Sequence, residues 1–225
     1  MLRKRRPPRM RQDDWEKLYS GILVDFGYSR LEDEASARLL AAIMANADLI
    51  DEDETSLFFK REVTVFGPAY DGHLSRDSFP GTLISAGDAT ALLVKARIYP
   101  DVIVTDLDGD IRSQKEASSR GALTFIHAHG DNADRIMEHA KDFRGPVVLT
   151  AQSGPFGPVV NYGGFTDGDR AVCIARHFGA SMIYLAGFDL SSPVAKEGSD
   201  PVVKAKKLRW AERIIGLDSD DIIII

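Results

Sequence analysis

From Val63 onward the chain repeats one pattern of hydrophobic and polar positions. A short apolar run, rich in β-branched residues, is followed by a polar loop and then by a stretch with helical spacing. Continuous apolar runs of this length are typical of strands buried on both faces of a sheet. Six runs occur, at residues 63–66, 82–85, 102–105, 123–126, 147–150 and 182–185. Their alternation with helices predicts an α/β fold with a doubly wound, mainly parallel six-stranded sheet.

The residues before Val63 have a helical pattern instead. Apolar side chains spaced by three and four positions run from Trp15 to Phe26, and Gly27 ends the stretch. Asp13 or Asp14 is expected to cap this helix.

A second helix is expected to begin at Ser29, which forms a capping box with Glu32, and residues 48–55 read as an acidic linker. We interpret residues 13–47 as a helical appendage that packs on, or is swapped against, the main body. The predicted division is a basic tail and helical appendage at 1–60 and an α/β catalytic domain at 61–225.

The composition is that of an ordinary globular protein, with 44% hydrophobic and 28% charged residues. The net charge of −6 disfavours non-specific nucleic-acid binding, and no apolar run approaches membrane-spanning length. The single cysteine, Cys173, excludes an internal disulfide and is expected to be a core residue. We expect a cytoplasmic protein that binds neither nucleic acid nor membrane.

Both ends of the chain are unusual in composition. Residues 1–11 are rich in Arg and Lys but lack the apolar segment of a signal peptide, so we interpret them as a solvated tail. Binding of a polyanion or a phosphate-bearing substrate is the alternative. The four isoleucines at 222–225 would promote aggregation if exposed, so we expect an edge strand or a subunit contact, and a homodimer.

Three carboxylates, Asp106, Asp108 and Asp110, follow the apolar run at 102–105. Alternate residues of an extended segment point the same way, so these side chains can converge. Converging carboxylates repel each other unless a cation lies between them, and hard oxygen ligands suit Mg²⁺ together with water and phosphate oxygens. The sequence therefore predicts a magnesium site, with an acidic turn after a strand as the alternative.

Glycine and polar residues follow the other strands too. They are Gly67, Pro68 and Tyr70, then Gly87 and Asp88, then His127, His129, Gly130, Asp131 and Asn132, then Gln152 and Ser153, and finally Gly187 and Asp189. In a parallel sheet these ends share one edge, where α/β proteins bind ligands. Asp131 and Asn132 also suit a helix N-cap, and the two histidines have the spacing of a zinc pair, although zinc usually recruits further ligands.

Two helices carry residues suited to phosphate. Residues 166–170 (Thr-Asp-Gly-Asp-Arg) open a helix, whose N–H groups favour anions once a cation offsets the aspartates. Lys204, Lys206, Lys207 and Arg209 on the last helix form either a solvated basic face or contacts to a triphosphate.

Taken together, these residues resemble the archaeal 6-hydroxymethyl-7,8-dihydropterin pyrophosphokinases. The matching landmarks are residues 63–68, 85–90, 104–108, 129–132, 164–170 and 185–189 and the lysine-rich last helix. The layout is also similar to thiamine pyrophosphokinase catalytic domains, which usually read alanine-aspartate-glycine where this chain has Ala86-Gly87-Asp88. The resemblance implies transfer of a pyrophosphoryl group from ATP to a pterin alcohol, with Mg²⁺ and release of AMP.

The resemblance also implies roles for single residues. Asp106, Asp108 and Asp131 are expected to hold Mg²⁺ and to act in catalysis. The residues expected to bind the nucleotide are Gly67, Pro68, Asp88, Asn132, Gln152, Thr166, Asp167, Asp169, Lys204 and Lys207. The loop at 152–164 leaves the ligand edge, so its Phe156 and Tyr162 are expected to stack on the pterin, with Tyr70 and His73 as the alternative.

Two further resemblances give other functions. The stretch Asp-Leu-Asp-Gly-Asp at 106–110 resembles the opening motif of haloacid-dehalogenase-type phosphatases, but those place it on the first strand. Residues 100–106 resemble the phospho-acceptor strand of receiver domains, which are about half this length and need an acidic pair after strand one. A non-catalytic nucleotide-binding module is the third alternative, because a fold does not fix a function. We favour the pyrophosphokinase.

Overall fold

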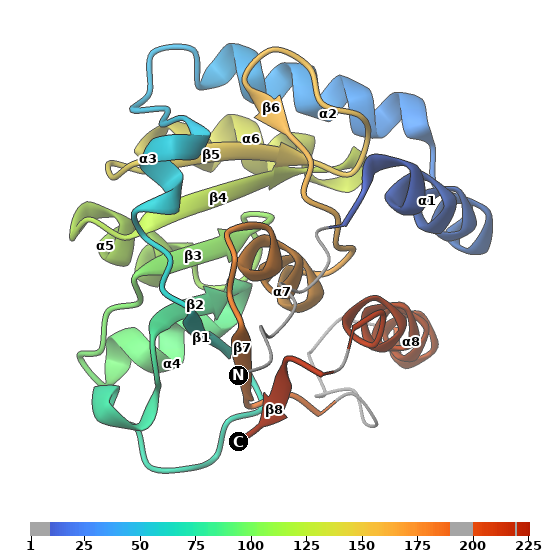
Figure 1. Ribbon diagram of the computed structural model, residues 1–225. Coiled ribbons are helices and arrows are strands. Elements are labelled where there is room, and N and C mark those ends of the chain that lie inside the picture. Colours follow the sequence, from blue (N-terminus) through green and yellow to red (C-terminus); the bar gives the residue numbers. More distant parts are fainter. Residues whose placement is uncertain (1–9, 190–199, 219) are drawn as a thin grey trace.

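The computed structural model describes residues 10–189, 200–218 and 220–225 (Figure 1). Its centre is one sheet of parallel strands in the order β6-β5-β4-β3-β2-β1-β7-β8. The strands are β1 (Glu62–Phe66), β2 (Thr82–Ala86), β3 (Val102–Thr105), β4 (Leu123–Ala128), β5 (Val147–Ala151), β6 (Val159–Val160), β7 (Met182–Ala186) and β8 (Ile222–Ile224). The predicted parallel α/β fold is confirmed, and the six predicted strands are extended by a short strand at each edge.

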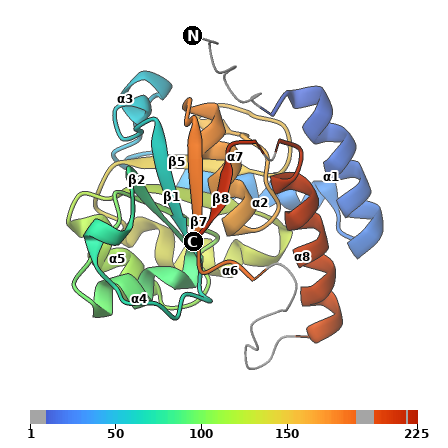
Figure 2. The same ribbon diagram turned by 60° about the horizontal axis from the view of Figure 1, so that its bottom comes forward.

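Helices cover both faces of this sheet (Figures 1 and 2). One face is covered by α2 (Arg30–Ile43), α4 (Thr90–Lys95), α5 (Ile111–Ser119) and α6 (Ala133–His139). The other face is covered by α7 (Asp167–His177), and α1 (Gln12–Phe26) and α8 (Pro201–Ile215) pack against α7 from outside. The doubly wound arrangement follows from the strands, since both of their faces are apolar and need a covering layer.

The order of the strands places a crevice at one end of the sheet. From β1 the chain proceeds through β2, β3, β4 and β5 to β6, and then returns to the opposite side of β1 as β7. The strands that follow β1 are therefore added on one side of it, whereas β7 and β8 are added on the other side. In open α/β sheets, ligands bind outside the carboxyl ends of the strands at such a reversal.

The N-terminal helices differ from prediction at their caps. The apolar stripe of α1 is buried and Gly27 ends the helix with a φ of 67°, as predicted. However, α1 begins at Gln12, so Asp13 and Asp14 lie in its first turn and not at the cap. The predicted capping box of α2 is also wrong, because the Ser29 side chain makes no cap hydrogen bond.

The first turn of α2 faces a neighbouring loop instead. The carboxylate of Asp33 accepts hydrogen bonds from the Tyr19 hydroxyl at 2.5 Å and from the Gly130 N–H at 2.7 Å. Ala37, Leu40 and Met44 then pack in the same core as β4 and β5. Helix α2 is therefore part of the helical layer that covers one face of the sheet. The division of the chain into two domains at residue 60 stays a prediction.

Two segments are more ordered than their composition suggests. Inside the supposed acidic linker, Glu52–Ser56 forms helix α3, capped by a reciprocal pair of hydrogen bonds between Asp51 and Glu54. Leu49 also bridges to Val147 of β5, so the linker prediction is wrong. Helix α5 was missed because it is largely polar and buries little more than Ala117 as an apolar anchor.

Cys173 of α7 and the C-terminal isoleucines lie where they were expected. Cys173 is buried between α1 and α8, and Ile222–Ile224 pairs with β7 as the edge strand β8. The basic tail lies outside the described residues except for its last two positions. In the described ranges, no helix combines the length and apolar character needed to span a membrane.

Candidate active site

Two adjoining cavities open at the carboxyl ends of the strands. The first, of about 220 Å³, is lined by Tyr28, Asp88, Asp106, Asp108, His129, Asp131, Gln152, Phe165, Thr166, Asp167, Arg170 and Lys207. The second lies at the reversal between β1 and β7 and is lined mainly by apolar groups, among them Pro68, Phe188, Leu208, Ala211 and Ile215. Thr166, Asp167 and Lys207 line both cavities, so one elongated ligand can extend across them.

The acidic turn after β3 is held in an unusual conformation. The strand ends at Thr105, and Leu107 is fully buried with a φ of 65°, a region that non-glycine residues rarely occupy. Thr105 accepts a hydrogen bond from the Leu107 N–H at 2.9 Å and donates to Gln114, which in turn donates to the carbonyl of Asp108. Backbone strain maintained by such contacts is typical of functional sites.

This turn separates the three carboxylates that extended geometry would have aligned. Asp106 and Asp108 line the first cavity, as predicted. Asp110 instead caps α5, accepting from the N–H of Ser113 at 3.3 Å and from its hydroxyl at 2.8 Å. The sequence-based geometry was therefore wrong for Asp110, because the chain leaves the extended conformation at Leu107.

The surroundings of Asp106 keep this carboxylate ionised. Burial favours its neutral form, but the His129 ring, 3.3 Å away, and the charges of Arg170 and Arg135 outweigh that effect. The pKa of Asp106 is therefore lowered well below its ordinary value. A carboxylate that stays charged at neutral pH is suited to a cation or to a positively charged reaction partner.

Asn132 supports the site from behind. It is 1% exposed, accepts a hydrogen bond from the His129 N–H at 2.9 Å, and donates to the carbonyls of Asp106 and His127. The hydrogen bonds of the Asn132 side chain therefore position the backbone of Asp106 and of His129. Asp131, next in the chain, is exposed and lines the cavity.

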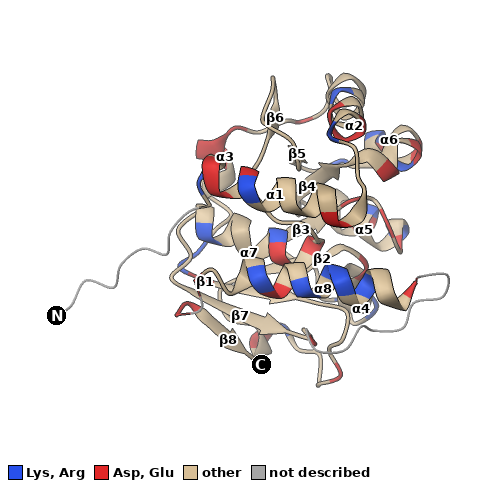
Figure 3. Ribbon diagram, turned by 90° about the vertical axis from the view of Figure 1, so that its right-hand side faces the viewer, with Lys and Arg blue, Asp and Glu red and all other residues tan. Residues whose placement is uncertain are grey.

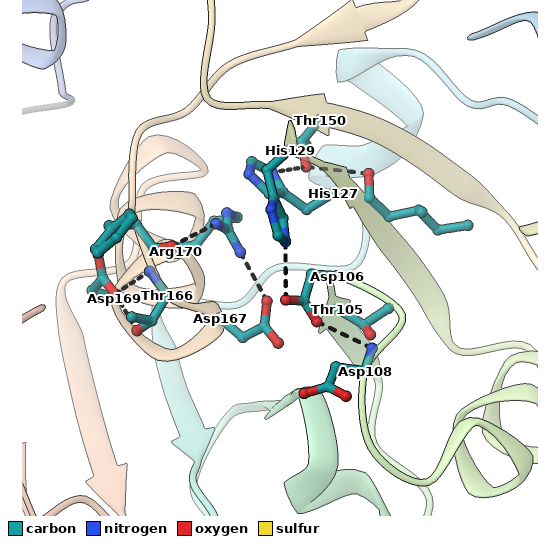
Figure 4. A network of polar contacts seen from close by, with 12 residues as sticks. Thr105, Asp106, Asp108, His127, His129, Thr150, Thr166, Asp167, Asp169 and Arg170 are labelled. Atoms are coloured by element: carbon teal, nitrogen blue, oxygen red, sulfur yellow. Dashed lines mark hydrogen bonds and ion pairs between the residues drawn. The ribbon is translucent and has the colours of Figure 1, made fainter. Parts of the chain in front are cut away.

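The N-terminus of α7 supplies another pair of aspartates with different roles (Figure 4). Asp169 is fully buried and accepts hydrogen bonds from the N–H groups of Phe165 at 2.6 Å and Thr166 at 2.8 Å and from the Thr166 hydroxyl. Asp167 lines both cavities and forms an ion pair with Arg170 at 2.8 Å. Asp169 therefore builds the helix cap, whereas Asp167 is available to a ligand.

The charge balance at Asp167 suits a bound cation. Burial and the nearby charge of Asp106 raise its pKa well above the ordinary value, despite the opposing charge of Arg170. In the described part of the chain, no group of three or more His, Cys, Asp or Glu side chains is arranged to hold a metal ion by itself. The donor set nevertheless fits Mg²⁺, which needs only one or two carboxylates and completes its shell with water and phosphate oxygens.

Replacing Asp167 by asparagine is expected to change the melting temperature of the ligand-free protein more favourably at pH 7 than at pH 4. A carboxyl whose pKa is raised by folding stabilises the folded state fully below its unfolded pKa, and this contribution is lost as pH rises through the folded pKa. Asparagine has no such pH-dependent loss, so the two pH values differ even though the variant also weakens the contact to Arg170. Thermal unfolding at both values checks this, with Asp110→Asn as the control because the pKa of Asp110 is lowered.

The remaining predicted residues divide between the cavities. Asp88 lines the first and accepts a hydrogen bond from the Asp110 N–H at 2.9 Å. Pro68 and Lys204 line the second. Gly67 lies behind it, where an added Cβ would be 2.6 Å from the carbonyl oxygen of Gly187, so only glycine fits without a shift.

The predicted aromatic wall is wrong. Phe156 is 39% exposed and lies 6.0 Å from the Arg38 guanidinium, and Tyr162 packs in the core beside Phe125 and Phe178. The alternative, Tyr70, packs on Phe66 and Phe79 and lines neither cavity. The aromatic residues at the cavities are Tyr28, Phe165 and Phe188, each next to a helix end or a glycine that the sequence did mark.

Comparison with known proteins identifies the family. Residues 76–194 match the family described as 6-hydroxymethylpterin diphosphokinase MptE-like. The chain belongs to this family. A Pyrococcus furiosus protein named 6-hydroxymethyl-7,8-dihydropterin pyrophosphokinase is 41% identical over 220 residues, which cover 92% of this chain and 93% of that protein. A Methanothermobacter thermautotrophicus protein of the same name is 38% identical over 216 residues, covering 89% and 92%.

A third relative, from Methanocaldococcus jannaschii and with the same name, is 32% identical over 236 residues, which cover 95% of this chain and 98% of that protein. The resemblance seen in the sequence is thus confirmed. The family match includes β2, β3, β4 and β5 and the start of α7, the elements that carry the acidic cavity.

Proposed function

We propose that this protein transfers a pyrophosphoryl group from ATP to 6-hydroxymethyl-7,8-dihydropterin and releases AMP. The observation that carries the proposal is the pair of adjoining cavities, because the acidic one suits a metal-bound polyphosphate and the apolar one suits a base or sugar. Relatives that bear this enzyme name match the chain over nearly its whole length, which supports the same reading.

ATP is proposed to lie across both cavities. Its adenosine occupies the apolar cavity at the strand reversal, and its phosphates pass Lys207 and the N-terminus of α7. Figure 3 shows the Lys and Arg residues of α8 as a blue band close to α7. Asp106 and Asp108 would hold Mg²⁺, with Asp131 at the rim as a further oxygen ligand; the ion would supply charge neutralisation for the polyphosphate.

The reaction itself needs positioning more than covalent chemistry. The acceptor hydroxyl attacks the β-phosphorus of ATP, a new phosphorus–oxygen bond forms, and the bond from that phosphorus to the oxygen of the α-phosphate breaks, so AMP leaves. Lys207 is placed to stabilise charge on the phosphate oxygens. Asp167 is placed to accept the hydroxyl proton, because it lines the acidic cavity together with Asp106 and Asp108 and is held there by Arg170.

The phosphatase alternative is not favoured by this arrangement. The motif at 106–110 follows β3, a central strand that β1 and β2 precede in the chain, whereas haloacid-dehalogenase-type enzymes place it on the first strand. The named relatives also support the pyrophosphokinase reading and not the phosphatase.

Incubation with ATP, Mg²⁺ and 6-hydroxymethyl-7,8-dihydropterin is expected to yield AMP, and omission of the pterin or chelation of the metal should abolish it. AMP is measured by chromatography, with glucose as a control alcohol that should yield none. Phosphate released from simple monoesters without AMP would support the phosphatase instead. Nucleotide binding without turnover would support the binding module.

We also propose a homodimer that does not bind nucleic acid. The net charge of −6 and the exposed isoleucines of the edge strand β8 support these two points. Light scattering of the full chain tests the dimer, and a monomer at micromolar concentration would contradict it.

A further inference from the structure

The inner wall of the first cavity contains buried polar atoms that have no hydrogen-bond partner. Oε1 of Gln152 and Nε of Arg170 are such atoms, and both residues line the cavity while being only 4% and 3% exposed. Nε2 of the buried His127, whose ring lies 6.3 Å from the ring of the lining residue His129, is a third. No hydrogen-bond partner for these three atoms is found within the described ranges of the chain. Buried polar groups are almost always paired, so three unpaired ones near one cavity indicate a ligand that pairs with them.

The fold brings these atoms together from three elements. In the β4–β5 ladder His127 lies beside Thr150, and its Nδ1 contacts the Thr150 hydroxyl at 3.0 Å. Alternate residues share a face of the sheet, so Gln152 follows on the same side as Thr150. Arg170 approaches from α7, and its guanidinium lies between Asp167 and the histidines (Figure 4).

The other walls of this cavity suit a flat ring. Tyr28 and Phe165 line it, with ring centroids 6.5 Å apart. Asp106 and Asp108 lie at the same cavity, so a ring held by Gln152 and these aromatic residues can direct a substituent at the carboxylates. Aromatic faces favour stacking on a heterocycle, and one polar edge fixes its orientation.

We infer that this cavity is the acceptor subsite and that Gln152 and Arg170 recognise the polar edge of the pterin ring. The inference rests on the proposed function and adds which cavity takes which substrate. The pyrimidinone edge of a pterin carries an amino group, an N–H and a carbonyl oxygen. Gln152 pairs with the donors, Arg170 Nε donates to an acceptor, and the hydroxymethyl group extends toward Asp106 and Asp108.

The second cavity does not offer this kind of recognition. Within the described ranges, none of its lining residues has a buried polar side-chain atom without a partner. Its floor is formed by Phe188, Leu208, Ala211 and Ile215. A pterin edge would meet no unpaired buried group among the described residues there, whereas Gln152 and Arg170 offer it both an acceptor and a donor in the first cavity.

The test replaces Gln152 by leucine, which keeps the size of the side chain and removes its polar end. The KM for 6-hydroxymethyl-7,8-dihydropterin is expected to rise about tenfold or more, while the KM for ATP stays near the wild-type value. The wild-type enzyme should also prefer the pterin to an analogue without the 2-amino group, and Gln152→Leu should lose this preference. Phe156→Ala, on the same loop but exposed, is the matched control and should change neither KM.

The KM values of the Gln152 variants distinguish the possible assignments of the two cavities. An increase in the KM for ATP alone would reverse the two subsites, and unchanged values for both substrates would remove Gln152 from recognition. Gln152→Met, also of similar size and without a hydrogen-bonding end, is the second variant if the leucine variant does not fold, and the same loss of preference is expected. If wild-type enzyme makes no AMP, the proposed function fails, yet titration by pterin fluorescence still tests the subsite. Equal pterin binding by wild type and variant would then overturn it.

Discussion

Asp106→Asn is expected to lower kcat by about 10²–10³-fold while leaving the protein folded. Asparagine has the shape of aspartate, so it can still accept the N–H of Asp108, which now contacts Oδ1 at 3.1 Å. The substitution removes a negative charge, because the surrounding groups lower the pKa of the Asp106 carboxyl and keep it ionised. Without that charge the site holds a divalent cation and its polyphosphate less firmly, which matters most where phosphoryl transfer depends on electrostatic stabilisation.

The control for this prediction is Asp110→Asn, four residues further on. It removes the same charge from the same turn, but Asp110 caps α5 and does not line either cavity. Asparagine is as good an N-cap as aspartate, so stability should change little. Steady-state AMP formation distinguishes the two variants. If both lose the same activity, the effect comes from net charge and not from the position of Asp106.

The parallel sheet was predictable because burial on both faces forces a simple pattern. β1, β2, β3, β4, β5 and β7 each read as a continuous apolar run. β6 has only two residues, and no pattern can be recognised at that length. Helix α5 is long enough to recognise, but it could not be predicted because it has hardly any apolar stripe.

The edge that carries the site was predictable too, because parallel strands all end on one side. The roles of single residues there were less so. Asp167 and Asp169 are two positions apart in one motif, yet one faces the cavities and the other caps α7. Asn132 resembles a ligand in the sequence, although it hydrogen-bonds the backbone behind Asp106. A polar residue at a strand or helix end serves either purpose, and only the three-dimensional path of the chain decides.

The aromatic wall shows the same limit for apolar residues. Tyr162 lies on the long loop at the ligand edge, but its ring is 5.5 Å from Phe178 in a cluster that covers the sheet. Tyr28, which does line the cavity, comes from the turn between α1 and α2, more than 70 residues before the acidic motif. The sequence marked the turn at Gly27 but not the contact of Tyr28 with the cavity, since this contact depends on how α1 packs on α7 and α8.

A second large effect is expected on stability, from the buried ion pair between Arg176 of α7 and Asp221. The two side chains are 5% and 6% exposed. Arg176 donates to both carboxylate oxygens, at 2.9 and 2.8 Å, and also to the carbonyls of Ile215 and Asp218. This one side chain therefore links α7 to the end of α8 and to the residue that precedes β8.

Asp221→Ala is expected to lower the free energy of unfolding by about 3–5 kcal/mol, because it leaves the guanidinium of Arg176 buried without its counter-charge. Urea unfolding measures the change, and Asp142→Ala is the control because its ion pair with Lys115, with side chains 26% and 54% exposed, is much more open to solvent and should contribute less. The double variant Arg176→Met/Asp221→Leu should recover much of the loss, since it removes both charges and fills the space with apolar groups. If the double variant is as unstable as Asp221→Ala, the loss comes from packing at the C-terminal segment and not from the unpaired charge.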